Sequence, residues 1–262
     1  MYTKEALKAQ LKQMGIKPTD TVVIHTSMKA IGDVEGGPDG VLDAFCEYLS
    51  DGLFLVPTHT WDDVTRSNPY FDVRISVPNI GLIPRRAALR KDGIRSLHPT
   101  HSVWAYGARA EEFVRGEERS GSPAPVGGCW DRMADWGTKI LLIGVDNTKN
   151  TFIHSVDERA ELPNRLCNTP FDVTVTDWNG KVRTFPMLHH SCSYTDDISL
   201  SYGIFEKPMV EMGVQTFGTF ADAQVRIVDA MGCRQLIMKI YNRATEDIFL
   251  QYTQLPEALY KD

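Results

Sequence analysis

The chain has 262 residues, of which 42% are hydrophobic and 24% are charged, and its formal net charge is −6. This composition is ordinary for a globular protein with one sizeable core, whereas a nucleic-acid-binding protein would show a basic stripe. No window reaches the roughly 18 apolar residues of a membrane span, and the N-terminal segment lacks the apolar region of a signal peptide. The five cysteines are an odd number without a C-x-x-C pair, so neither a disulfide framework nor a zinc ribbon is indicated. We therefore expect a cytoplasmic protein without a membrane or nucleic-acid partner.

The first part of the chain has the pattern of an α/β fold. Apolar residues at helical spacing predict a helix over 3–14, which Gly15 ends. A short buried strand is expected at 21–25, a helix at 41–49 and a second strand at 53–56. A strand–helix–strand order of this kind is a βαβ unit, which implies a parallel pair of strands.

The middle of the chain combines an irregular segment with further α/β elements. Residues 61–84 show little periodicity, and we interpret them as an active-site loop; a helix follows at 83–90. The apolar run at 140–143 predicts another buried strand. Alternating apolar and polar residues over 171–185, on both sides of an Asn-Gly pair, predict a β-hairpin.

The C-terminal part is expected to be largely helical. Helical spacing favours a helix over 220–231, with further elements at 225–228 or 236–240, and an amphipathic helix over 242–260. No internal repeat or long linker interrupts the chain, so we predict a single domain over 1–262. The fold class is α/β: a mixed, partly parallel sheet with flanking helices, plus a C-terminal β-hairpin and helical portion.

A candidate general base follows the strand at 140–143. His154 is three residues before Asp157 and four before Glu158, and in a first helical turn these positions share one face. An imidazole oriented by a carboxylate is the usual equipment of a general base. The same spacing also fits a surface His-Asp pair that caps a helix.

A glycine-rich loop, HTSMKAIGDVEGG, follows the strand at 21–25. Glycines after a strand let backbone N–H groups approach a phosphate or an acyl oxygen, and the next helix would point its positive end there. The loop is neither G-x-G-x-x-G nor a Walker A motif, so dinucleotide and nucleoside triphosphate sites lose support. Glycines alone also fit an ordinary turn between strand and helix.

Two histidine-containing segments are candidates for a polar cleft or a metal site. His98 and His101 are three residues apart, but Pro99 disfavours a helix at His98, and no third ligand stands at zinc-like spacing. A loop whose imidazoles and hydroxyls line a cleft is the favoured interpretation. The pair His189-His190 fits a metal site, a catalytic contribution or a solvated turn.

Paired carboxylates offer candidate sites for a cationic substrate. Asp62 and Asp63 stand beside Trp61, which would make a cradle for an amino sugar, although such a pair also caps loops. A second pair, Asp196-Asp197, follows the His189-His190 segment. The mildly acidic charge of the chain would also suit a cationic small molecule.

Several of these segments together resemble the aminoglycoside 3-N-acetyltransferase family. In chain order they are HTSMKAIGDVEGG (25–37), RSLHPTHSVWAYG (95–107) with Arg109–Glu111, Ser122–Val126, and ILLIGVDNTKNTFIHSVDERAELPN (140–164). The likeness covers most of residues 1–170 and fades to the general layout beyond about 185. It implies transfer of an acetyl group from acetyl-CoA, without a metal, to the 3-amino group of a 2-deoxystreptamine antibiotic. The implied fold is not the common N-acetyltransferase (GNAT) fold, and the chain lacks the [QR]-x-x-G-x-[GA] loop of that fold.

The resemblance also implies roles for individual residues. His154 would deprotonate the amine in a ternary complex. Asp157 stands where the family usually has a glutamate, whose side chain is one methylene longer. If Asp157 does not reach the imidazole or the amine, Glu158 is the alternative carboxylate. The residues that match the CoA-binding loop and tunnel wall are Thr26, Ser27, Met28, Val34, Glu35, Gly36, Gly37, Thr100, Ser102 and Val103. The carboxylates expected to bind the cationic substrate are Asp62, Glu158 and Asp196.

Three other functions stay open on sequence grounds. A metal-dependent amidohydrolase would use His98, His101, His189 and His190 and would be inhibited by chelators. A CoA-binding module that lost catalysis through Asp157 would bind acetyl-CoA without turnover. An acyltransferase of the same family acting on a different amine is the third, because function depends on the site rather than on the fold. The sequence indicates no oligomeric state.

Overall fold

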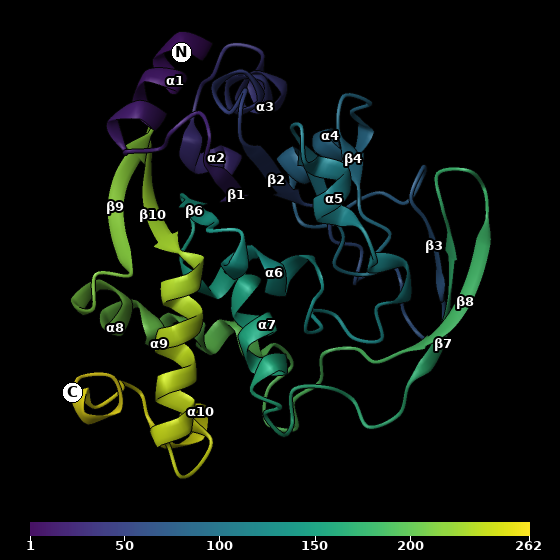
Figure 1. The fold of residues 1–262 in the computed structure, drawn as a ribbon, viewed down its shortest axis with the longest axis vertical. Helices are drawn as coiled ribbons and strands as arrows, with labels where there is room; N and C mark the ends of the chain where they lie inside the picture. Colours follow the sequence, from purple (N-terminus) through teal and green to yellow (C-terminus); the bar gives the residue numbers. More distant parts are fainter.

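The computed structural model describes residues 1–262 and forms two β-sheets, the larger with helices on both faces (Figure 1). The larger sheet has seven strands in the order β4-β5-β2-β1-β6-β10-β9. Their bounds are β1 Thr21–Thr26, β2 Leu53–Pro57, β4 Ile94–Arg95, β5 Val103–Tyr106, β6 Lys139–Ile143, β9 Gln215–Phe220 and β10 Ala223–Asp229. Strands β2, β1 and β6 run parallel at the centre, and every other neighbouring pair is antiparallel. The predicted parallel pair and the mixed α/β class are confirmed.

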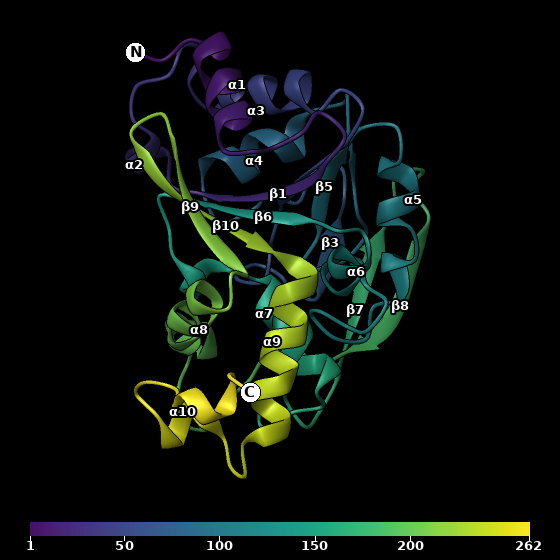
Figure 2. The ribbon, with the colours of Figure 1, turned by 60° about the vertical axis from the view of Figure 1, so that its left-hand side comes forward.

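Helices cover the two faces of this sheet (Figure 2). The longer helices are α1 Lys4–Gln13, α3 Gly37–Tyr48, α4 Leu82–Leu89, α6 Cys129–Asp135, α7 Phe152–Arg159 and α9 Ala230–Arg243. The shorter ones are α2 Met28–Ile31, α5 Ala110–Val114, α8 Glu206–Glu211, α10 Ile248–Gln251 and the 3-10 helices η1 Glu117–Arg119, η2 Asn147–Lys149, η3 Ile198–Phe205 and η4 Glu257–Leu259. None of these helices has the length and hydropathy needed to cross a membrane.

The core is divided by the sheet because successive side chains of a strand point to opposite faces. Val22 and Ile24 of β1 pack in the cluster beneath α1, α3 and α4, whereas Val23 packs in the cluster with α6, α7 and α9. The buried runs that predicted strands at 21–25, 53–56 and 140–143 are therefore central strands covered on both faces. The helices predicted at 3–14 and 83–90 are confirmed, and the one predicted at 41–49 begins earlier, at Gly37.

The second sheet is small and has the order β3-β7-β8, with β3 Tyr70–Asp72, β7 Phe171–Thr176 and β8 Val182–Met187. Strands β7 and β8 form the predicted hairpin, which stands beside the larger sheet in Figure 1. The sheet has a hydrophobic cluster of its own around Phe71 and Val173. Arg95 joins it to the larger sheet: its guanidinium lies 5.0 Å from the Phe71 ring centroid, and its carbonyl accepts a hydrogen bond from Trp178.

Two C-terminal predictions are wrong. Residues 220–231 are not a helix, because β9 and β10 form a hairpin there, with a turn at Ala221, where φ is +53°. Val225 and Val228, three residues apart, fit helical spacing, yet both are buried in a strand paired between β6 and β9. Residues 242–260 are not one helix either: α9 ends at Arg243, and only α10 and η4 follow. The backbone becomes extended at Ala244 (φ −75°, ψ 139°), and Asp247 then caps α10 by accepting a hydrogen bond from the Phe249 N–H.

Candidate active site

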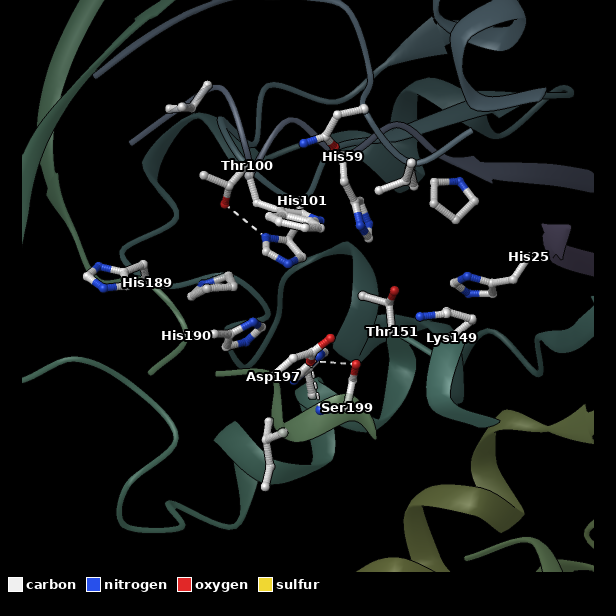
Figure 3. Close-up of a pocket in the computed structure, with 18 of the residues that line it drawn as sticks. His25, His59, Thr100, His101, Lys149, Thr151, His189, His190, Asp197 and Ser199 are labelled. Atoms are coloured by element: carbon white, nitrogen blue, oxygen red, sulfur yellow. Dashed lines mark hydrogen bonds between the residues drawn. The ribbon is translucent and has the colours of Figure 1, made fainter. Parts of the chain in front are cut away.

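A cavity of about 900 Å³ lies where the parallel strands end (Figure 3). Thr26 at the end of β1, His59 after β2 and Val145 after β6 all line it. The carboxyl ends of parallel strands are the usual position of a ligand site in α/β proteins. The segment predicted to be an active-site loop, 61–84, contributes Trp61 and other residues to the wall, although it also contains the short strand β3.

Histidines dominate the wall of this cavity. Six of the seven histidines in the chain line it, and these are His25, His59, His101, His154, His189 and His190. All of them except His154 are labelled in Figure 3. The rings of His154 and His190 are stacked, with centroids 4.0 Å apart, and His101 lies 5.1 Å from His190 and 4.7 Å from His59. Burial lowers the pKa of His25 to about 3 and holds the pKa values of His59 and His101 well below the usual value. These three buried histidines are therefore neutral at pH 7.

The seventh histidine, His98, supports the wall instead of lining it. Its Nδ1 accepts hydrogen bonds from the backbone N–H groups of Thr100 (3.2 Å) and His101 (2.8 Å). Its Nε2 lies 2.9 Å from the Ser122 carbonyl, which accepts only, so Nε2 carries the proton. Both nitrogens are thus engaged, and no three His, Cys, Asp or Glu side chains converge as metal ligands would. His98 therefore has no free nitrogen to offer the metal site of the amidohydrolase alternative.

Arg95 fixes the two segments that carry His59 and His101. Its side chain is fully buried and donates to the Thr58 carbonyl (2.7 Å) and to Ser102 Oγ (3.0 Å). Burial lowers the pKa of Arg95 to about 9, so it stays protonated at neutral pH. Because Ser102 turns inward to this guanidinium, its side chain is fully buried and does not line the cavity.

The candidate base, His154, is in the first turn of α7, as predicted. Its Nδ1 lies 2.7 Å from the Tyr202 hydroxyl, and that hydroxyl donates to Asp157 Oδ2 at 2.6 Å. A phenol has one proton, so the His154–Tyr202 bond requires the proton of the imidazole to be on Nδ1. His154 then keeps the lone pair of Nε2 for the cavity. Asp157 reaches the imidazole only through Tyr202, so the direct contact expected from their spacing does not form.

The electrostatic surroundings keep this histidine neutral. Burial, reinforced by His190 and His59, holds the pKa of His154 well below its usual value. Burial also raises the pKa of Asp157 to about 6, against the hydrogen bonds from Tyr202 and from Tyr241 (2.5 Å to Oδ1). A neutral imidazole next to a carboxylate that ionises above about pH 6 can accept a proton and stabilise the resulting charge.

Glu158 does not face the cavity. Its Oε1 accepts from the backbone N–H of Ala124 at 2.7 Å, and its Oε2 accepts from the Ser122 hydroxyl. The side chain is only 5% exposed, and its nearest imidazole nitrogen is Nε2 of His190, at 3.5 Å. Glu158 therefore anchors the 122–124 segment and is not placed to bind a substrate.

The other predicted site residues divide into two groups. Thr26, Thr100 and Asp196 line the cavity. Those that do not line it are Ser27, which caps α2, Met28 at the start of α2, the core residues Val34 and Val103, the exposed Glu35 and Asp62, and Gly36 and Gly37 at the start of α3. Tyr202 and Tyr241 were missed, because they are 45 and 84 residues from Asp157 in the chain and no local spacing indicates them.

Comparisons with known proteins indicate the family and the fold of this chain. Residues 23–242 match the family model described as aminoglycoside 3-N-acetyltransferase. The aminoglycoside N(3)-acetyltransferase III of Serratia marcescens is 29% identical over 200 residues, which are 70% of this chain and 74% of that protein. A point mutant of aminoglycoside acetyltransferase AAC(3)-IVa in complex with a gentamicin superposes with a TM-score of 0.79 at 21% identity, covering 98% of this chain and 93% of that one. The binary complex of AAC-IIIb with CoASH gives a TM-score of 0.78 at 19% identity, covering 94% and 99% of the two chains. The two superpositions show that the fold is shared.

Proposed function

Because this chain belongs to the aminoglycoside 3-N-acetyltransferase family, we propose that it transfers an acetyl group from acetyl-CoA to the 3-amino group of a 2-deoxystreptamine aminoglycoside. The observation that carries the proposal is His154, whose Nδ1 is held by Tyr202 and whose Nε2 is left without a protein partner in a histidine-walled cavity. A general base positioned in this way contributes about 10²–10⁴-fold to a rate.

The cavity is large and offers groups that fit acetyl-CoA. Its volume of about 900 Å³ is at the upper end of small-molecule sites. Thr26 and Thr100 both line the cavity with hydroxyl-bearing side chains. Lys149 places a cation at the cavity for a phosphate group (Figure 3). Outside the lining of the cavity, the N-terminus of the 12-residue helix α3, at Gly36 and Gly37, is a second place for phosphate binding. These features fit acetyl-CoA, which supplies an acetyl group activated as a thioester.

The residues of the chain then perform the proton transfers. Nε2 of neutral His154 accepts the proton that the acceptor nitrogen loses as it bonds to the acetyl carbon. The carbon–sulfur bond breaks, and the imidazolium returns its proton to the departing sulfur, so the base is regenerated. Asp157 offsets the imidazolium charge between these two steps. Asp196, exposed on the cavity wall, positions an ammonium group of the acceptor.

A second candidate acceptor is an amine with fewer charges than an antibiotic. The lining carboxylates are Asp196 and Asp197, and the lining cations are Arg66 and Lys149, so the fixed charges of the wall cancel. Asp62, expected to receive a cationic drug, lies outside the lining. A polycation gains little from such a wall, whereas a mono- or diamino sugar needs only one of its carboxylates.

The test is a thiol-release assay with acetyl-CoA, a panel of 2-deoxystreptamine aminoglycosides and a set of mono- and diamino sugars, with and without EDTA. CoA release that needs an aminoglycoside and survives EDTA supports the first proposal, and release with the simpler amines alone supports the second. His154→Ala should abolish release while the circular dichroism spectrum and melting temperature stay unchanged. Turnover retained in His154→Ala would refute the assignment of the base. Acetyl-CoA that raises the melting temperature without any turnover would identify a binding module.

A further inference from the structure

We propose that Tyr202 is a positioning residue that connects the carboxylate of Asp157 to the imidazole of His154. The inference rests on the proposed role of His154 as general base, and it concerns how that base is held. No local sequence pattern indicates this contact, because η3, which carries Tyr202, is far from α7 in the chain.

The geometry of three side chains carries the proposal. His154 and Asp157 are one turn apart on α7, yet the shorter aspartate makes no hydrogen bond to the imidazole. The hydroxyl of Tyr202 fills the gap, at 2.7 Å from Nδ1 and 2.6 Å from Oδ2. One proton on each donor gives a continuous chain in which Nδ1–H donates to Tyr202 and Tyr202 donates to Asp157.

Packing holds Tyr202 in this position. The side chain is fully buried, and its ring lies 6.3 Å from the Phe205 ring and 5.9 Å from the Phe249 ring. A ring enclosed in this way cannot swing its hydroxyl away without disturbing the core. The aromatic contacts themselves do not need the hydroxyl, so Tyr202→Phe removes the bridge and leaves the packing intact.

Groups from three other segments complete the surroundings of Asp157. Tyr241 of α9 donates to Oδ1 at 2.5 Å, and Nε of Arg165 lies 3.6 Å from Oδ2. Arg165 is itself held by Asp247, at 2.9 and 3.0 Å. His190 and His59 are the remaining titratable groups that act on His154. Tyr241 touches only the carboxylate, whereas Tyr202 touches both the carboxylate and the base.

This difference makes Tyr241→Phe the matched control for Tyr202→Phe. Without the Tyr202 hydroxyl, Nδ1 loses its only partner, so the imidazole can rotate or place its proton on Nε2, where it can no longer act as a base. We expect kcat to fall about 10²–10³-fold in Tyr202→Phe, within the range of a general-base contribution, while the KM for acetyl-CoA changes less than threefold. Tyr241→Phe should lose less than tenfold, because His154 keeps its Tyr202 bond.

A spectroscopic measurement tests the same contact without turnover. In the wild-type protein without substrates, ¹⁵N NMR of labelled histidine, assigned with His154→Ala, should show His154 protonated on Nδ1. In Tyr202→Phe we expect a mixture of tautomers or the Nε2–H form. An unchanged Nδ1–H signal in Tyr202→Phe, or equal kinetic losses in Tyr202→Phe and Tyr241→Phe, would overturn the proposal. Absence of wild-type turnover would refute the proposed function, and the NMR result would still decide the role of Tyr202.

A rescue variant separates positioning from a purely structural role. A glutamate at position 157 is longer by one carbon–carbon bond, about 1.5 Å, and can approach Nδ1 where the tyrosine hydroxyl was. We expect the double variant Tyr202→Phe with Asp157→Glu to recover at least tenfold in kcat over Tyr202→Phe. A double variant no faster than Tyr202→Phe, with an unchanged melting temperature, would contradict the idea that the hydroxyl serves to carry the carboxylate to the base.

Discussion

Asp131 of α6 anchors the helix that carries His154, and its removal should measurably destabilise the fold. Asp131 is only 2% exposed. Its carboxylate accepts hydrogen bonds from Nε and Nη2 of Arg159, both at 2.7 Å, and from the Gly127 N–H at 2.8 Å. The guanidinium of Arg234 lies 3.4 Å away. Breaking a buried ion pair costs about 3–5 kcal/mol, but Arg159 is 32% exposed and can turn to water. We therefore expect Asp131→Ala to lower the free energy of unfolding by about 3 kcal/mol. Urea unfolding followed by circular dichroism measures this loss, and the melting temperature should fall by roughly 6–12 °C.

The matched control for this prediction is a surface pair with the same chemistry. Asp39 binds Arg86 through both carboxylate oxygens, but the two side chains are 39% and 46% exposed, so Asp39→Ala should cost less than about 1 kcal/mol.

The loss of stability in Asp131→Ala should also depend on pH. Burial pushes the pKa of Asp131 upward, but the bonds from Arg159 and Gly127 outweigh it and hold that pKa below its usual value. The stabilisation is thus present at neutral pH and is lost as the pH falls below about 4. Equal losses in the two variants, or a loss independent of pH, would refute the reasoning.

Two further predictions concern activity. Burial raises the pKa of Asp157 to about 6, so the fraction of ionised carboxylate, and with it kcat, should increase as the pH rises from 5 to 7. Asp157→Asn should be slower, and its kcat should not rise with pH over this range. The same rise in the variant would assign the titration to another group. Asp196→Ala should raise the KM for the amine about three- to fivefold, which corresponds to the roughly 0.6–1 kcal/mol of an exposed ion pair, while the KM for acetyl-CoA stays within twofold. A parallel rise of both KM values would contradict the placement of Asp196 at the acceptor.

The parts of the fold that follow from the sequence are those that local patterns determine. Short apolar runs predicted the central strands, because a strand buried on both faces must be apolar throughout. The hairpin around Asn179-Gly180 followed from its turn residues and alternation. The β9–β10 hairpin did not, because the apolar residues Val225 and Val228 fit either a helix or a strand, and only pairing with β6 decides between them.

The candidate site likewise has parts that local sequence patterns predict and parts that only the folded chain reveals. His154 was identified from its own segment, but the cavity wall brings together histidines from five separate parts of the chain, at 25, 59, 101, 154 and 189–190. Each of them alone fits an ordinary buried or loop histidine. Their convergence depends on which strands are neighbours, and a strand order with β1 between β2 and β6 is a property of the sheet as a whole.

Asp157, the residue that made catalysis doubtful on sequence grounds, is connected to His154 by a residue distant in the chain. An aspartate at 157 falls one methylene short of the length expected in the family, which left open a protein that binds CoA without turnover. In the structure, Tyr202 spans the distance that the shorter carboxylate leaves, and Tyr241 and Arg165 hold that carboxylate in place. In the proposed mechanism the carboxylate acts on His154 through a hydroxyl instead of directly, over a longer path. Whether a base is supported is therefore decided by the whole chain of contacts around His154, and a difference at one position of a motif does not by itself indicate lost activity.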